Sequence, residues 1–175
     1  NETTIENEVA SEMIMKINDT EVSVVWEENE SVSALIELAE KAPGTIQMSM
    51  YGGFEQVGPI GVNLPRNDVQ TTTQAGDIVL YSGNQIVVFY GSNSWSYTRL
   101  GRIDLSEDEM TALLSNGDVT ISGSAKLTVK AKGDGLTYTW YFKNSGKSTY
   151  SKSSITSATY SVKMTGKVKD RQVYC

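Results

Sequence analysis

The sequence predicts a mainly β protein, in which a closed β-barrel with two short helices is followed by an incomplete β-sandwich. Two observations carry this prediction. Residues 75–103, AGDIVLYSGNQIVVFYGSNSWSYTRLGRI, are β-branched and aromatic runs separated by turn-forming residues, as in consecutive antiparallel strands. Residues 126–175 contain short strand-like runs at a spacing of roughly ten residues, which is typical of a sandwich.

The distribution of charge divides the chain into two parts. Residues 1–125 carry nineteen acidic and five basic side chains, whereas residues 126–175 carry two acidic and ten basic ones. A break this sharp predicts a domain boundary near Gly123 and Ser124. We therefore expect a flexible tether over residues 1–12, the barrel over residues 13–123 and the sandwich over residues 124–175.

The first segments of the barrel part predict a hairpin, a helix and a set of short strands. Residues 13–17 and 21–26 alternate apolar and polar side chains around a turn at 18–20, as in a hairpin. Apolar residues recur at helical spacing over residues 32–39, which predicts an amphipathic helix that covers a sheet. Residues 46–64 are punctuated by glycine, as the corners of a barrel require.

The next segments predict the central strands. Residues 77–82 and 85–90 are apolar runs on either side of Gly83 and Asn84, a pair that tolerates positive φ and suits a tight hairpin. A third strand is expected over residues 97–103. This part of the chain is expected to form the middle of the barrel.

A second helix and a closing strand complete the predicted barrel. Ser106 and Glu109 have the spacing of a capping box, and the apolar residues among 110–114 form one helical face. Asn116 and the glycine after it end this helix. Residues 119–122 are then expected to return as the closing strand.

Particular residues of this part resemble a known family. The strand start GDIV at residues 76–79, the strand VVFYG at 87–91 and the terminal GRI at 101–103 are joined by MSMYGGFE at 48–55 and VNLP at 62–65. In this pattern the barrel part resembles the small bacterial cyclophilin-like domains. The resemblance implies a closed cyclophilin-like β-barrel.

The last part of the chain resembles a second family. Its segments GDGLTYTWYFKN at residues 133–144 and GKVKDRQVYC at 166–175 are similar to the immunoglobulin-like repeats of bacterial cell-surface proteins. The resemblance implies that Trp140 is the buried tryptophan of the sandwich, and the chain stops where a final strand is expected. We therefore expect a truncated immunoglobulin-like sandwich, with strands at residues 127–131, 136–142, 159–164 and 171–175.

The residue composition excludes several kinds of catalytic site. The sequence contains no histidine, and its one cysteine is Cys175. Triads that depend on histidine and zinc sites of the Cys-rich kind are therefore excluded within this sequence. We expect no metal site and no cofactor, because no phosphate-binding glycine loop is present either.

Charge and hydropathy bear on the partners. The acidic first part would repel nucleic acid, and the lysines of the second part alternate along strands as on a solvated sheet face. We expect no nucleic-acid partner. No segment is long and apolar enough to cross a bilayer, so we expect no transmembrane segment.

Candidate ligand-binding residues are aromatic and methionine side chains of the barrel part, which form adaptable apolar walls, together with one arginine. The alternative is that individual members simply fill the core. Arg99 is also the candidate for a catalytic guanidinium, although its alternation with Leu100 equally predicts an outward position on a sheet. The candidates are Met50, Tyr51, Phe54, Phe89, Trp95, Tyr97 and Arg99.

The two resemblances suggest a function. Immunoglobulin-like repeats imply an exported protein attached to the cell envelope, with a lipoprotein anchor ahead of Asn1 as one form of attachment. Our leading hypothesis is a non-catalytic binding or structural module of a bacterial cell surface, with a peptide, a protein or a carbohydrate as partner. The alternative is a degenerate peptidyl-prolyl isomerase that uses Arg99, and a third hypothesis is a carrier of a small ligand in the barrel mouth.

Overall fold

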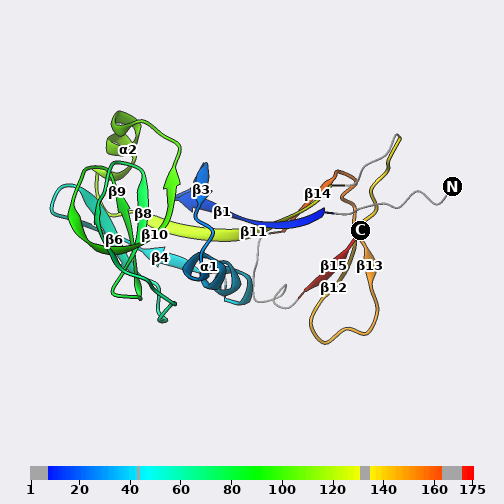
Figure 1. The fold of residues 1–175 in the computed structure, drawn as a ribbon. Helices are drawn as coiled ribbons and strands as arrows, with labels where there is room; N and C mark the ends of the chain where they lie inside the picture. The colour runs from blue at the N-terminus through cyan, green and yellow to red at the C-terminus, as the bar shows by residue number, and fades with distance from the viewer. Residues whose placement is uncertain (1–7, 43, 131–134, 163–170) are drawn as a thin grey trace. The chain divides into compact units, whose positions relative to one another are not determined.

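The computed structural model describes residues 8–42, 44–130, 135–162 and 171–175 (Figure 1). The chain forms two compact units. Unit 1 comprises Asn1–Met13, Leu38–Pro43 and Ser124–Cys175, and unit 2 comprises Ile14–Glu37 and Gly44–Gly123.

Unit 2 contains one antiparallel sheet and part of a second, whose strands β1 and β11 continue into unit 1; Figure 1 shows the sheets around the label β10 and along β11. The seven-stranded sheet has the order β3-β10-β8-β9-β6-β5, with β7 paired to β10, and the second sheet has β4, β11, β1 and β2 side by side. The strands are β1 (Glu8–Ile17), β2 (Thr20–Val22), β3 (Val24–Trp26), β4 (Thr45–Gln47), β5 (Ser49–Tyr51), β6 (Glu55–Pro59), β7 (Val69–Thr72), β8 (Asp77–Tyr81), β9 (Gln85–Phe89), β10 (Ser94–Ile103) and β11 (Thr120–Lys130).

The expected closed barrel is not found among the described residues, because the chain passes from one sheet to the other at two single residues. Ser23 separates β2 from β3, and its carbonyl accepts a hydrogen bond from the amide of Asp104 at 2.9 Å. Met48 separates β4 from β5, and its amide donates to the carbonyl of Val119 at 2.9 Å. The strands therefore divide into two hydrogen-bonded ladders instead of one closed ladder.

The strands β8 and β9 are buried on both faces. The register pairs Ile78 with Val88 and Leu80 with Ile86, so these side chains share one face. Val79 pairs with Val87 on the opposite face. All six side chains are at most 2% exposed. On the face of Val79 and Val87, the Phe89 cluster, defined as Val79, Val87, Phe89 and Tyr97, forms an apolar layer of its own.

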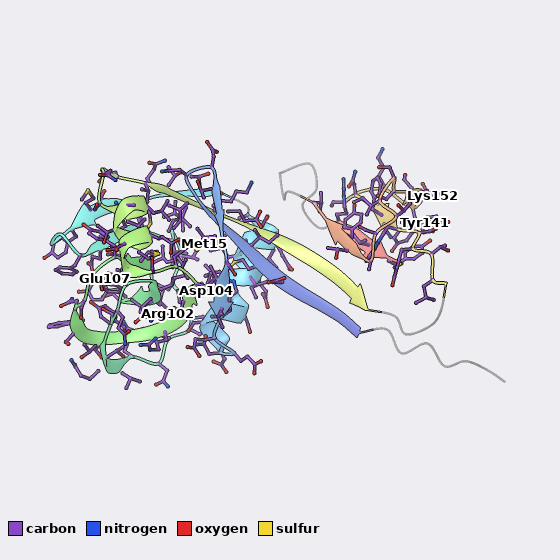
Figure 2. All side chains as sticks on the ribbon, turned by 90° about the horizontal axis from the view of Figure 1, so that it is seen from above. Met15, Arg102, Asp104, Glu107, Tyr141 and Lys152 are labelled. Carbon is purple, nitrogen blue, oxygen red and sulfur yellow. The ribbon has the colours of Figure 1, made fainter. Side chains whose placement is uncertain are left out.

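The two predicted helices are present. Helix α1 (Glu30–Lys41) begins after Asn29, whose side-chain oxygen accepts from the amide of Val32 at 2.9 Å. Helix α2 (Glu107–Leu114) has the predicted capping box of Ser106 and Glu109, and Figure 2 shows Glu107 at its start. Among the described residues, neither these helices nor any other helix is long and apolar enough to span a membrane.

A buried amide connects α2 to β6. Gln56 is fully buried, and its Nε2 atom donates to the carbonyl oxygens of Leu114 and Gly117, both at 2.8 Å. The last carbonyls of a helix have no partner within the helix itself. Gln56 supplies partners at this end of α2 and so holds the helix to the sheet.

Two features of the central strands differ from the prediction. Positive φ falls on Ser82 (53°) and Gly83 (78°), not on Gly83 and Asn84, because Tyr81 pairs with Gln85 and leaves a three-residue turn. Strand β10 begins at Ser94 instead of residue 97. Its first residues pair with β7, a strand that the sequence did not predict.

Unit 1 contains the second part of β11, together with β12 (Tyr141–Lys143), β13 (Ser151–Lys152), β14 (Thr159–Ser161) and β15 (Gln172–Tyr174). Strand β14 pairs with β11, and β13, β12 and β15 form a three-stranded sheet. Figure 2 labels Tyr141 and Lys152, which pair across β12 and β13. The immunoglobulin-like sandwich is not confirmed by these short strands.

Trp140 is the centre of the core of unit 1. It is fully buried, its ring centroid lies 5.2 Å from that of Tyr160, and its indole N–H donates to the carbonyl of Ser157 at 2.9 Å. The expected strand over residues 136–142 is wrong for 136–140, because β12 begins only at Tyr141. The expected strands over 127–131 and 159–164 reach residues 131, 163 and 164, which lie outside the described residues.

Strand β1 includes part of residues 1–12, the segment that we expected to be a flexible tether. It begins at Glu8, so residues 8–12 of that segment lie in a strand. Residues 1–7 lie outside the described residues. Strand β11 is continuous through Gly123 and Ser124, the position at which the two units divide.

Substitution of Gly58 tests how closely β6 packs against Met48, the residue that separates β4 from β5. A Cβ atom at Gly58 would lie 2.5 Å from the Met48 sulfur and 2.6 Å from the Gln47 carbonyl oxygen. Because the second contact is with backbone, Gly58→Ala is expected to lower the free energy of unfolding by about 2–3 kcal/mol. Urea denaturation measures this loss, and an unchanged midpoint would contradict the packing of β6 against this corner.

Candidate functional site

One face of the seven-stranded sheet carries the candidate site. Residues at alternate positions on neighbouring strands share a face, and the register pairs Glu55 with Phe89 and Val57 with Val87. Glu55 and Val57 of β6 therefore lie on the same face as the Phe89 cluster. Phe54 and Tyr81 also pack against this cluster. The Phe89 cluster is therefore a buried apolar layer on this face of the sheet, and it forms the floor of the site.

A pocket of about 410 Å³ opens on this face. Its walls are largely aromatic, and the rings of Tyr81 and Tyr97 meet edge to face with centroids 6.1 Å apart. Tyr51 and Trp95 form an exposed rim, with 63% and 56% of their surface accessible. The lining residues are Tyr51, Glu55, Val57, Tyr81, Gln85, Val87, Asn93, Trp95 and Tyr97.

Glu55 is the only lining residue that ordinarily carries a charge at neutral pH. It is only 8% exposed, and its Oε2 atom has no hydrogen-bond partner among the described residues. Burial raises the pKa of this carboxyl from its ordinary value of 4.5 to about 7. The side chain is therefore a buried acid that the pocket leaves unpaired.

Tyr97 belongs to the Phe89 cluster and also lines the pocket. Its hydroxyl oxygen accepts a hydrogen bond from Asn93 Nδ2 at 2.9 Å, and its ring lies 5.7 Å from that of Phe89. Burial raises the pKa of Tyr97, and the nearby charge of Glu55 raises it further, against the Asn93 hydrogen bond, which lowers it. Tyr97 therefore remains a neutral phenol at physiological pH.

Asp77, at the other end of this face, is a buried acid that is fully paired. Its Oδ1 atom lies 3.0 Å from Nη1 of Arg102, which Figure 2 labels, and its Oδ2 atom lies 3.3 Å from Nη2 of Arg99. The amide of Gln74 also donates to Oδ2, at 2.9 Å. The guanidinium of Arg99 is thus bound to Asp77 and is not part of the aromatic lining, while part of the Arg99 side chain remains exposed.

A second hollow, of about 660 Å³, lies beside Arg99. Its lining includes charged side chains of both signs, and Tyr97 lines both hollows. The side chain of Arg99 is 41% exposed and contributes to this lining, and Arg66 is a second cation in it. The lining residues are Asn29, Glu30, Ser31, Pro65, Arg66, Asn67, Val69, Thr71, Tyr97, Thr98 and Arg99.

The structure places the predicted binding residues in different environments. Tyr51, Trp95 and Tyr97 line the aromatic pocket together. Phe89 lies fully buried in the floor, and Phe54 packs against the floor without lining the pocket. Met50 is 38% exposed on β5 and is not part of either lining, and Arg99 lines the second hollow instead.

Sequence reasoning missed Glu55 and Tyr81. Glu55 sits in the run FEQVG, where it shares its face with Val57, so an acid at an apolar position was the signal that could have identified it. Its burial depends on Phe89, which is far along the chain. Tyr81 ends β8 as the outer member of an apolar run and reaches the pocket only through the register with Gln85.

The comparison with known families identifies the family of the chain. A family model described as the Cyclophilin-like family matches residues 15–123, which is more than half of the chain. This chain belongs to the cyclophilin-like family. The match covers every residue of both linings, so unit 2 is called the cyclophilin-like unit below. No curated protein and no solved structure matches the chain.

The described part of the cyclophilin-like unit contains no group of three or more His, Cys, Asp or Glu side chains arranged to hold a metal ion. The chemistry that the pocket offers is therefore that of one carboxyl, several phenols and an indole. These groups can accept and donate hydrogen bonds and can stack on a flat or cationic ligand.

Replacing the carboxyl of Glu55 tests its burial. In an unfolded chain this group ionises near pH 4.5, whereas in the folded chain it stays protonated up to about pH 7. Because the folded state binds more protons within this window, the stability that Glu55 contributes is present at low pH and is lost as pH rises through 7. Glu55→Gln is therefore expected to be more stable than the parent chain by about 1–3 kcal/mol at pH 8 and nearly equal at pH 4.5.

Urea denaturation at both pH values measures this difference. Glu107→Gln is the matched control, since it removes the same charge at an exposed position of α2 and should show no comparable gain at pH 8. A constant difference between Glu55→Gln and the parent across this range would contradict a raised pKa.

Proposed function

We propose that the cyclophilin-like unit is a non-catalytic binding module and that its ligand enters the aromatic pocket. The single observation that supports this most is the unpaired, buried carboxyl of Glu55 beneath a rim of exposed aromatic side chains. An apolar concavity with one or two convergent polar groups is the usual form of a ligand site. The lining offers no nucleophile paired with a base, which favours binding over catalysis.

The proposal includes the location expected from the sequence, namely the surface of a bacterial cell. Its support is the resemblance of the last part of the chain to immunoglobulin-like surface repeats. A peptide, a protein side chain or a carbohydrate presented outside the cell could each place a group in an open pocket with an aromatic rim.

Substitution of Trp95 tests the binding proposal. Trp95→Ala removes a large exposed wall of the pocket without opening the buried floor, so ligand binding should weaken by about tenfold or more while stability stays nearly unchanged. The measurement is a nuclear magnetic resonance screen of the full chain against a library of small neutral and charged fragments, with amide shifts followed at the lining residues.

Val25→Ala is the control for this screen, because Val25 is 70% exposed on β3 and lines neither hollow. Fragments that shift lining amides in the parent and in Val25→Ala, but not in Trp95→Ala, are the expected result. If no fragment shifts the lining amides of the folded parent chain, the binding proposal is wrong.

The second candidate function is peptidyl-prolyl isomerisation, which the resemblance to cyclophilins implies. The observation that favours it is the partly exposed side chain of Arg99, which lines the second hollow together with Tyr97. A guanidinium donates hydrogen bonds in a fixed planar fork, so it could polarise the amide before a proline. In this candidate function Asp77 holds that fork in place.

A protease-coupled assay with X-Pro peptides tests the isomerase. If it is correct, Arg99→Lys should lose at least about tenfold in the rate, because lysine lacks the planar fork. Arg66→Lys changes the other cation of the same hollow and serves as the control. No acceleration by the folded parent chain, or an equal loss in both variants, would remove Arg99 from this role.

A further inference from the structure

The aromatic pocket lacks a partner for its own acid. Two buried acids on one face of the sheet differ in their ion pairs. Asp77 has two arginines within 3.3 Å, whereas no ion pair to Glu55 is present among the described residues. Arg99 and Arg102, the arginines of β10, are both committed to Asp77. The positive charge that Glu55 would attract must therefore come from outside this lining.

The walls around Glu55 suit a cation as well. Tyr51, Tyr81, Trp95 and Tyr97 surround the pocket, and the faces of tyrosine and tryptophan rings attract an ammonium or guanidinium group through their quadrupoles. Tryptophan is the strongest of the aromatic side chains in this respect. The remaining polar lining groups, Gln85 and Asn93, are uncharged.

We propose that the aromatic pocket recognises an aliphatic organic cation, with the ammonium or guanidinium group paired to Glu55 and its carbon chain lying between Tyr51 and Trp95. This inference rests on the proposed binding function and names the chemical class of its ligand. The basic side chain of a peptide and a free amine share this chemistry. The pocket volume of about 410 Å³ has room for such a chain.

The buried state of Glu55 links this binding to pH. Burial raises the pKa of Glu55 to about 7, and a bound cation requires the ionised carboxylate. The other titratable groups that face Glu55 are the phenols of Tyr51 on β5, Tyr81 on β8 and Tyr97 on β10, while β9 contributes Gln85. Binding of a cation is therefore expected to follow the ionisation of Glu55 between pH 6 and 8.

Three probes with the same carbon chain test the charge preference. n-Hexylammonium, n-hexanol and hexanoate are positive, neutral and negative, and their binding to the full chain is measured by amide shifts at the lining residues. At pH 8 we expect n-hexylammonium to bind about tenfold more tightly than n-hexanol, and hexanoate most weakly. The affinity for n-hexylammonium should rise about tenfold from pH 6 to pH 8, whereas the affinity for n-hexanol should not rise.

Two variants separate the charge from the shape of the pocket. Glu55→Gln keeps the size of the side chain, and in this variant n-hexylammonium should lose its advantage over n-hexanol and its dependence on pH. Glu107→Gln removes an equal charge from the exposed first turn of α2 and should behave like the parent chain.

The outcomes distinguish this inference from the proposed function. If n-hexanol or hexanoate binds as tightly as n-hexylammonium at pH 8, or more tightly, the proposed preference for a cation is wrong, whereas the proposed binding function is retained. A preference for n-hexylammonium that persists in Glu55→Gln also overturns the inference, because the charge would then act elsewhere. If none of the three probes binds, the inference fails, and the proposed function fails with it only if the fragment screen is negative as well.

Discussion

The burial of β8 and β9 on both faces is the constraint on which the rest of the cyclophilin-like unit depends. Strands with apolar side chains on both faces require a covering layer on each side. Ile78 and Leu80 lie on one face, while Val79 and Val87 lie on the other, where they pack with Phe89 and Tyr97. The aromatic residues of the second layer do not fill their side of the sheet completely, and the aromatic pocket is the space that they leave. The candidate site is thus a product of how the centre of the sheet is covered.

Asp77 and Glu55 are two buried acids on the same face, and they avoid the free-energy cost of an unpaired buried charge in different ways. A buried carboxylate is costly unless it is paired or protonated. Asp77 is paired, since two guanidinium groups and one backbone amide surround it. Glu55 has a raised pKa instead, which places its charge under the control of pH and of whatever occupies the pocket. A structural role fits the first acid, and a binding role fits the second.

Local signals in the sequence were enough to predict several elements. The capping box of Ser106 and Glu109, the helical spacing before Pro43 and the alternation around residues 18–20 all act within a few residues. The structure confirms both helices, and it confirms the first hairpin as far as Val22, whereas residues 24–26, which we expected in the same hairpin, pair with β10 instead. The passage between sheets at Met48 and the strand β7 could not be predicted in this way, because they depend on partners far along the chain. Residue type alone similarly identified aromatic lining residues. The positions of Glu55 and Tyr81 in the lining follow from the register of the strands, which the sequence does not give.

The aromatic pocket has a buried, well-packed floor and a solvent-exposed rim. Phe89, Val87 and Tyr97 at its base are at most 4% exposed and packed on several sides, so they are already ordered before any ligand arrives. Tyr51 and Trp95 at the edge have more than half of their surface in solvent. Immobilising a side chain on binding costs conformational entropy. Among the exposed aromatic side chains of the pocket, a ligand bound as proposed would incur that cost at Tyr51 and Trp95, each with two rotatable bonds, so that related ligands of different lengths would not require rebuilding of the interior.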